Sequence, residues 1–292
     1  MRSFLGRLAD VLIFPAFLAC TGAGTCGLLR TRAPLWAVPL AVLAPAVAAV
    51  AVLERLRPER PEYRLLDQRP QNEVGHFLLG LEAGALIGNG LAIAAASAAA
   101  SLLGAHPEAS VWPTAWPPGL QILLAVILGE GVSYWQHRFA HRLRWLWGFH
   151  ALHHSGERLN FVRAGRFHVV DTATAAFLTY VPITLARAPG FVFVWVAVLA
   201  GSLGLIQHAN IRMRTPAWLD RVMCTPAVHR FHHSRRFEES DGNFGTTVMI
   251  FDLLFRSYVR PPGAGPEGVG LENDPVPREF WRQVFMPFRR RG

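Results

Sequence analysis

Residues 120–154 read LQILLAVILGEGVSYWQHRFAHRLRWLWGFHALHH, and this stretch decides the fold. Its first half, residues 120–135, is mostly apolar and approaches the length of about 20 residues with which a helix crosses a lipid bilayer. Its second half holds five histidines: His137, His141, His150, His153 and His154. The stretch therefore predicts a membrane helix that ends at a candidate metal site.

Eight of the twelve histidines form three compact clusters, of which the first is the pair His137 and His141. The third cluster consists of His229, His232 and His233, and it repeats the spacing of the second, His150 to His154. Residues at positions i, i+3 and i+4 share one face of an α-helix, with Cβ atoms about 5–6 Å apart. Each cluster is therefore expected to direct its imidazoles at one point.

The number of imidazoles predicts two metal ions rather than one. Neutral imidazole is the commonest metal-ligating side chain and suits iron, zinc and copper. Because about four ligands close a tetrahedral zinc site, eight ring nitrogens favour two ions, each near octahedral with one position open. An open position on a redox-active metal is where oxygen chemistry takes place.

The composition predicts an all-α integral membrane helical bundle that carries a histidine-rich cap for two metals. Of the 292 residues, 51% are apolar and only 17% are charged, and no strand-like alternation competes with the helical pattern. The long apolar stretches are residues 11–29, 35–53, 77–103 and 120–135. Two shorter ones, residues 172–186 and 191–205, form either a spanning pair or a hairpin that enters one leaflet.

The basic residues indicate the orientation in the membrane. All 29 are arginine, which indicates codon bias, so the net charge of +9 is weak evidence for nucleic-acid binding and no nucleic-acid partner is expected. Arginines follow the second and fourth apolar stretches, whereas the link 104–119 has none. By the positive-inside rule, every histidine cluster is expected on the cytoplasmic side of a membrane, the bacterial inner membrane. Arg30 and Arg32 fall on the outer side, against the rule.

Three consecutive segments are expected along the chain. Residues 1–75 form an N-terminal transmembrane hairpin and an Arg/Pro linker, and the first helix is favoured over a cleaved signal peptide because no clear cleavage site follows it. Residues 76–260 form the membrane-embedded catalytic domain. Residues 261–292 form a Pro/Gly-rich basic tail that is flexible or lies on the surface.

Four short motifs carry a family resemblance. They are YWQHRFAH (134–141), LWGFHALHHS (146–155), HRFHHS (229–234) and DGNFG (241–245). Together they resemble the fatty acid hydroxylase superfamily, also called the sterol desaturase family, over roughly residues 120–260. The resemblance implies a membrane-bound enzyme that holds a non-haem di-iron centre in a cytoplasmic histidine-rich cap and uses O₂ to hydroxylate or desaturate lipids.

The resemblance also implies a set of metal ligands. The cluster histidines that match the family's motifs are His137, His141, His150, His153, His154, His229, His232 and His233. Family members supply a further histidine between the second and third clusters, and here His208 and His168 are the candidates. For His168, a ligand and a hydrogen-bonded structural histidine are both open.

Carboxylates are expected beside the ligands. An all-histidine shell is neutral, so two Fe²⁺ ions would bring about four positive charges into a region of reduced dielectric. Acidic groups that accept a hydrogen bond from the second ring nitrogen of a ligand would offset this charge. The candidates are Glu130, seven residues before His137; Asp171, three after His168; and Asp241, after the third cluster.

The clusters and the resemblance together predict an enzyme: an O₂-dependent di-iron lipid hydroxylase or desaturase acting on a C–H bond of a sterol, fatty acyl or alkylglycerol lipid. The cofactors are two iron ions (Fe²⁺/Fe³⁺), which zinc can replace in a purified sample, and O₂ is the co-substrate. Because no flavin, haem or iron–sulfur motif is visible, a separate redox partner protein is expected to supply electrons. A membrane metal-binding or transport protein and a non-catalytic lipid-binding relative are the alternatives, and the oligomeric state is left open.

Overall fold

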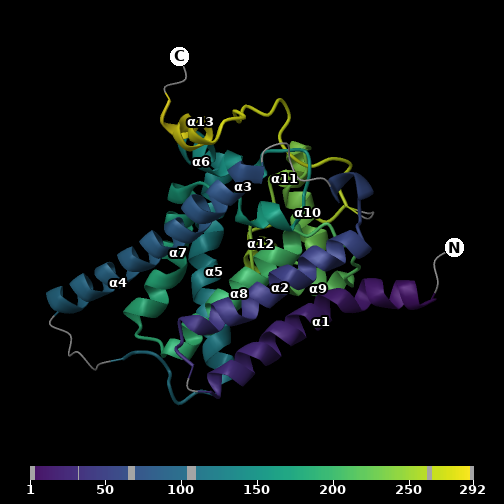
Figure 1. Cartoon of the computed structure of the whole chain (residues 1–292). Coiled ribbons are helices and arrows are strands. Elements are labelled where there is room, and N and C mark those ends of the chain that lie inside the picture. The colour runs from purple at the N-terminus through teal and green to yellow at the C-terminus, as the bar shows by residue number, and fades with distance from the viewer. Residues whose placement is uncertain (1–3, 32, 65–69, 104–109, 262–264, 290–292) are drawn as a thin grey trace. The chain divides into compact units, whose positions relative to one another are not determined.

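The computed structural model describes residues 4–31, 33–64, 70–103, 110–261 and 265–289. Regular structure in these ranges is helical, without a strand, so the predicted all-α fold is confirmed (Figure 1). Arg32 and parts of the two loops used for the orientation, residues 65–69 and 104–109, lie outside the described residues.

Within the described residues, five helices are long and apolar enough to cross a membrane. They are α1 (Phe4–Leu29), α2 (Ala37–Leu56), the helix Gln71–Leu102, α5 (Pro118–Arg142) and α8 (Gly190–His208). The helix Gln71–Leu102 combines α3 (Pro70–Gly75), the π-helical η2 (His76–Ala83) and α4 (Gly84–Leu102). The apolar helix α7 (Val169–Leu185) is shorter, with 17 residues. These helices confirm the predicted apolar stretches as helices and are those of an integral membrane protein.

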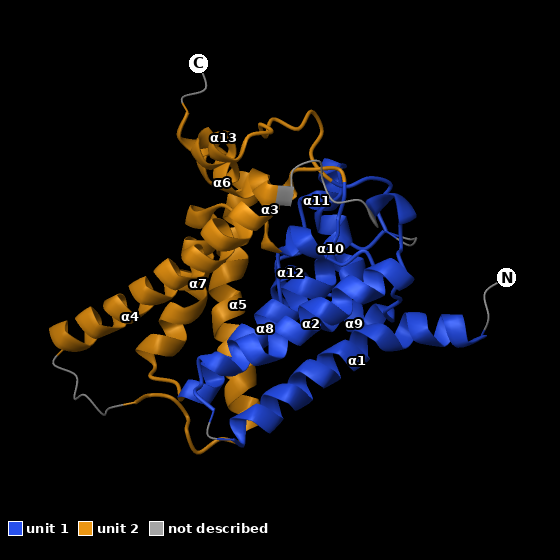
Figure 2. Ribbon diagram, viewed as in Figure 1, with its two compact units in different colours: residues 1–66, 158–164, 190–269 blue, residues 67–157, 165–189, 270–292 orange. Residues whose placement is uncertain are grey.

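The chain divides into two compact units (Figure 2). Unit 1 comprises residues 1–66, 158–164 and 190–269, and unit 2 comprises residues 67–157, 165–189 and 270–292. Each unit is therefore assembled from segments that are distant in the sequence. The three consecutive domains expected above stay a prediction.

Unit 1 is built on the packing of α1, α2 and α8. In its core, Phe14 and Phe17 of α1 meet Val50 of α2 and Leu203 and Ile206 of α8. Five short helices complete the unit: η1 (Pro61–Arg64), α9 (Ala217–Val222), α10 (Pro226–His232), α11 (Phe237–Ser240) and α12 (Ile250–Leu254). Because α10 packs on α8, the third histidine cluster lies beside the end of a membrane helix. The 3-10 helix η3 (Phe161–Gly165) crosses the sequence boundary between the units.

Unit 2 is built on α7, which packs against α4, α5 and α6 (Arg144–His154). Leu143 lies between α5 and α6 and separates them, because its backbone is extended (φ −101°, ψ 115°). The break changes the direction of the chain, so the first two histidine clusters can face each other. The last helices are α13 (Phe280–Phe285) and η4 (Met286–Phe288).

The C-terminal tail docks on the start of the helix Gln71–Leu102. The His76 Nε2 and Gln283 Oε1 atoms are 2.7 Å apart, and Asn72 donates to the Arg278 carbonyl at 2.8 Å. The His76 ring also packs against Phe280. Part of the tail is therefore ordered on unit 2, while Trp281 on its outer face is 62% exposed and has the amphipathic character of an interfacial anchor.

Small residues bring α4 and α7 into backbone contact. A Cβ atom on Gly84 would lie 2.8 Å from the Thr172 Cβ, and one on Gly88 would lie 2.3 Å from the Ala173 carbonyl oxygen. Glycine at such spacing is the usual means by which membrane helices approach closely, because lipid offers no hydrophobic force to drive them together. The contact holds α7 in place, and with it the start of α7 that faces the histidines.

Replacing Gly88 by leucine is expected to destabilise unit 2. The new side chain would overlap main-chain atoms of α7 that cannot move aside, and overpacking costs about 1–3 kcal/mol. The measurement is the thermal unfolding midpoint in detergent, with Gly90→Leu as the matched control because nothing lies within 4 Å of a Cβ built there. Equal midpoints for the two variants would contradict the close packing of α4 and α7.

Candidate metal centre

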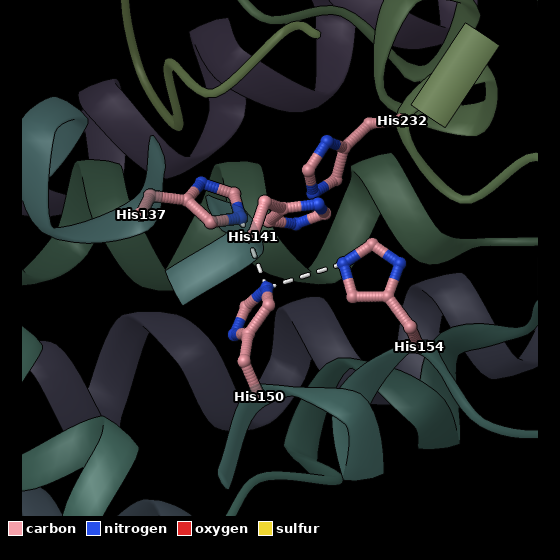
Figure 3. A group of neighbouring side chains, drawn as sticks. All are labelled: His137, His141, His150, His154 and His232. Carbon is pink, nitrogen blue, oxygen red and sulfur yellow. Dashed lines mark hydrogen bonds between the residues drawn. The ribbon is translucent and has the colours of Figure 1, made fainter. Parts of the chain in front are cut away.

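Four histidines of unit 2 form the first group. His137 and His141 lie one turn apart on α5, and His150 and His154 lie one turn apart on α6. One ring nitrogen from each lies within 4.8 Å of those of the others. Figure 3 shows these four rings directed toward one another; His232, also drawn there, belongs to unit 1 and is considered below.

The spacing within this group fits a bound cation. The His150 Nε2 atom lies 3.1 Å from His137 Nε2 and 3.1 Å from His154 Nε2. A proton shared between two ring nitrogens can account for one of these two close pairs but not for both. A single metal ion accounts for both, because it accepts a lone pair from every ring. Ligands at right angles on an ion with metal–nitrogen bonds of about 2.1 Å are about 3.0 Å apart. The donors therefore suit a transition metal such as iron.

Three histidines of unit 1 form the second group. His208 ends α8, and His229 and His233 lie one turn apart at α10. The Nε2 atom of His229 lies 3.1 Å from those of His208 and His233, and all three side chains are buried. His208 donates from Nδ1 to the Gly204 carbonyl at 2.6 Å, which leaves its Nε2 lone pair for a metal. The arrangement repeats that of the first group and places His208 among the candidate ligands.

His153 and His232 are the middle histidines of the second and third clusters. Neither belongs to the same group as the other two histidines of its own cluster. His153 is absent from the group of His150 and His154, and His232 from that of His229. The prediction that each cluster directs all its rings at one point is therefore wrong for these two residues. The reason is geometric, because consecutive residues project about 100° apart around a helix, so the i+3 and i+4 side chains diverge.

Backbone carbonyls orient these two diverging rings. The Nδ1 atom of His153 lies 3.3 Å from the Arg166 carbonyl oxygen, and that of His232 lies 2.8 Å from the Gly242 carbonyl oxygen. The His153 ring is also stacked on Phe167, with centroids 3.9 Å apart. A proton on Nδ1 makes Nε2 the ligating nitrogen, so both rings have the tautomer that a metal ligand needs.

Asp171 is the carboxylate that touches the first group. Its Oδ2 atom accepts a hydrogen bond from His150 Nδ1 at 2.8 Å, and its Oδ1 atom accepts one from the Gln136 amide at 3.1 Å. Burial alone raises the pKa of Asp171, but the nearby His150 and His137 and the Gln136 hydrogen bond outweigh it, so the pKa lies below its ordinary value. An ionised Asp171 holds the Nδ1 proton of His150 and fixes the ring; its support of a metal ligand stays a prediction.

A buried carboxylate holds the loop after the third cluster through hydrogen bonds. The buried Asp252 accepts hydrogen bonds from the Phe244 and Gly245 N–H groups, at 2.9 and 2.7 Å, and from the Ser257 hydroxyl at 2.7 Å. A Cβ on Gly242 would lie 2.5 Å from the Ser257 carbonyl oxygen, so only glycine fits at the position whose carbonyl faces His232. Asp252 thus supports a ligand indirectly, a role that its position in the sequence does not reveal.

The remaining site candidates lie elsewhere. His168 caps the start of α7: its Nδ1 accepts from the Val170 N–H at 3.1 Å, and its Nε2 donates to the Val284 carbonyl at 2.9 Å. Burial lowers the pKa of His168, which favours the neutral ring that this pairing needs. The geometry therefore favours the structural interpretation of His168. Glu130 is buried on α5, and Asp241 ends α11; their support of ligands stays a prediction.

Comparison with known proteins identifies the family of the chain. A family profile described as fatty acid hydroxylase matches residues 122–257, which include both groups. The ornithine lipid hydroxylase OlsE of Rhizobium tropici is 34% identical over 284 residues, which cover 96% of the chain and 84% of that protein. No solved structure matches the chain significantly.

Alkylglycerol monooxygenases are also similar, over a smaller part of their length. The enzyme of Danio rerio is 30% identical over 175 residues, which cover 60% of the chain and 37% of that enzyme. The enzyme of Homo sapiens is 30% identical over 125 residues, which cover 43% of the chain and 27% of that enzyme. The aligned region thus spans about a third of these monooxygenases.

Proposed function

Because the chain belongs to the fatty acid hydroxylase family, we propose that it is a di-iron membrane enzyme that uses O₂ to hydroxylate a C–H bond of a membrane lipid. The observation that carries this proposal is the pair of buried imidazole groups, each built where a helix of membrane-spanning length ends. Such a placement lets a lipid present a carbon to the metals while its chains stay in the bilayer.

The residues that would hold the metals follow from the two groups. One ion would take ligands from His137, His141, His150 and His154, and the other from His208, His229 and His233. His153 and His232 would supply further ligands through Nε2. Iron held in this way supplies the redox chemistry by which one oxygen atom of O₂ enters a C–H bond and the other leaves as water, at the cost of two electrons and two protons.

The chain's own groups prepare this chemistry. Asp171 holds the Nδ1 proton of His150, and the Arg166 and Gly242 carbonyls face Nδ1 of His153 and His232. Fixed rings keep the ligand nitrogens aimed at the ions. Burial of the ligands excludes bulk water, which protects the oxidising site from unproductive proton and electron transfer.

The substrate class follows from the relatives as well as from the site. One extensive match is to an ornithine lipid hydroxylase, and the alkylglycerol monooxygenases act, by name, on alkylglycerols. We expect a polar membrane lipid, with an ornithine-type lipid as the first substrate to test and sterol, fatty acyl and alkylglycerol lipids after it. A separate redox protein supplies the electrons, and the metals face the cytoplasm from the bacterial inner membrane.

Removal of the metal is expected to abolish lipid oxidation reversibly. The protein, purified in detergent and stripped with a chelator, should form no O₂-dependent product from a lipid extract until Fe²⁺ and a reductant are added. Product is measured by mass spectrometry of the lipids under air and under nitrogen. A stripped protein that oxidises lipid at the original rate, or an iron-loaded protein that forms no product from any of these lipid classes, would contradict the proposal.

A further inference from the structure

A cavity of about 230 Å³ opens in unit 1. Its wall includes Glu59, Arg60, Tyr63, Leu159, Asn210 and Arg230. None of the metal ligands lines it, and the chemistry described so far does not use it.

The Arg230 guanidinium is buried at this cavity with donors to spare. The residue is only 8% exposed, and its Nη2 donates to the Ala209 and Ile211 carbonyls at 2.9 and 2.8 Å. Its Nε and Nη1 atoms make no hydrogen bond within the described part of the chain. A buried cation with unused donors is costly unless an acceptor meets it, so the cavity is suited to a ligand that supplies acceptor atoms.

The charges around the cavity favour a negative ligand. Arg60 and Arg230 contribute two positive charges to the wall, against the carboxylate of Glu59. Arg60 already donates to the Tyr63 hydroxyl and to the Pro266 and Glu267 carbonyls, so it contributes mainly its charge. That carboxylate already faces two other guanidinium groups, with Arg214 Nη1 at 3.2 Å and Arg212 Nε at 3.8 Å. Planar guanidinium groups match the oxygens of carboxylates and phosphates. An oxyanion is therefore the ligand that complements this wall.

The cavity lies next to the second metal group along the chain. Asn210 follows the ligand His208 by two residues, and Arg230 directly follows the ligand His229. Hydrogen bonds join this end of α8 to the segment after α2: Asn210 Oδ1 accepts from the Arg60 N–H at 2.9 Å, and Asn210 Nδ2 donates to the Arg60 carbonyl at 2.8 Å. The apolar helices α2 and α8 thus both end beside the cavity. Because membrane helices end at the level of the lipid headgroups, the cavity is expected at that level.

We propose that this cavity is an oxyanion subsite, in which Arg230 donates hydrogen bonds to the carboxylate or phosphate of the substrate's headgroup and the positive charge of Arg60 attracts it. The inference rests on the proposed function and deepens it, because anchoring the polar end of a lipid determines which of its carbons reaches the metals. The subsite selects lipids with an acidic group over neutral lipids that have the same chains.

The test compares lipid retention by the full-length protein in detergent, measured by native mass spectrometry. The probes are ornithine lipid with a carboxylate, phosphatidylglycerol with a phosphate, and neutral diacylglycerol with matched chains. The wild type should retain at least one acidic lipid about tenfold more tightly than diacylglycerol, and Arg230→Lys should remove most of this preference because lysine lacks the forked donors. Leu159→Trp fills the cavity without touching Arg230 and should have the same effect.

Matched controls are Arg236→Lys, whose side chain is 62% exposed, and Leu185→Trp, at a residue that is 48% exposed. Both should keep the wild-type preference. The proposal is overturned if the wild type retains neutral and acidic lipids equally, or if neither cavity variant changes the preference. It is also overturned if inorganic phosphate stabilises the protein while the lipids show no headgroup preference, since the cavity would then take only the free ion.

These binding measurements are made on metal-free protein as well as on the iron-loaded protein. Lipid oxidation without a headgroup preference would therefore overturn this inference alone. A headgroup preference without any lipid oxidation would overturn the proposed function alone.

Discussion

Replacing His150 by alanine is expected to lower both iron content and O₂-dependent lipid oxidation. The Nε2 atom of His150 lies 3.1 Å from those of His137 and His154, so its ring is central to the first group. Loss of a group that hydrogen-bonds to a metal ligand already lowers metal affinity or activity by about 10–100-fold. Loss of a central ligand should exceed the upper end of that range. The measurements are iron per chain by elemental analysis and the rate of product formation.

The matched comparison for this variant is His168→Asn. His168 caps α7 through Nδ1 and lies outside both groups, and asparagine is itself a good N-cap. This variant should keep the wild-type iron content. A His150→Ala protein with full iron content and activity would refute the assignment of the first group, and a loss of iron in His168→Asn would restore His168 as a ligand.

Replacing Asp171 by asparagine is expected to lower iron affinity or turnover by about 10–100-fold. The carboxylate accepts the His150 Nδ1 proton at 2.8 Å and carries the negative charge that offsets the metal. Asparagine keeps the size and one oxygen acceptor but loses the charge, so the fold should survive while the ligand becomes less basic. The measurement is activity as a function of added Fe²⁺ together with the thermal unfolding midpoint.

Two further variants show whether the effect belongs to Asp171 as a positioning residue. Asp171→Glu retains the charge and should recover part of the iron affinity, and Glu238→Gln removes a charge from an exposed position and should change nothing. An Asp171→Asn protein with wild-type iron affinity and turnover would show that the hydrogen bond to His150 is not needed. Asp241→Asn then tests directly whether Asp241 shares this role.

Much of the fold could be predicted from the sequence because membrane helices and metal clusters leave strong periodic signals. The apolar stretches correspond to helices, and the i, i+4 pairs His137 and His141, His150 and His154, and His229 and His233 each point into a common group. The pairs depend on local spacing, which a helix converts into a shared face. His208 was a candidate through the family resemblance, which implies a further histidine between the second and third clusters.

The remainder depends on contacts that leave no local signal. The divergence of His153 from His154 depends on which partner each ring meets, and the backbone carbonyls of Arg166 and Gly242 that face the ligands have no side-chain signature. The Arg230 cavity was also missed, because its wall combines residues that follow α2, α8 and His229. Only tertiary structure brings such segments together.

Iron stoichiometry tests the central claim most directly. The wild-type protein, reconstituted anaerobically with Fe²⁺ and washed free of loosely bound metal, should hold about two iron ions per chain, as expected for two separate imidazole groups. His150→Ala and His229→Ala should each retain about one ion if the groups load independently. A wild-type value at or below one ion per chain, unchanged by either variant, would contradict the account.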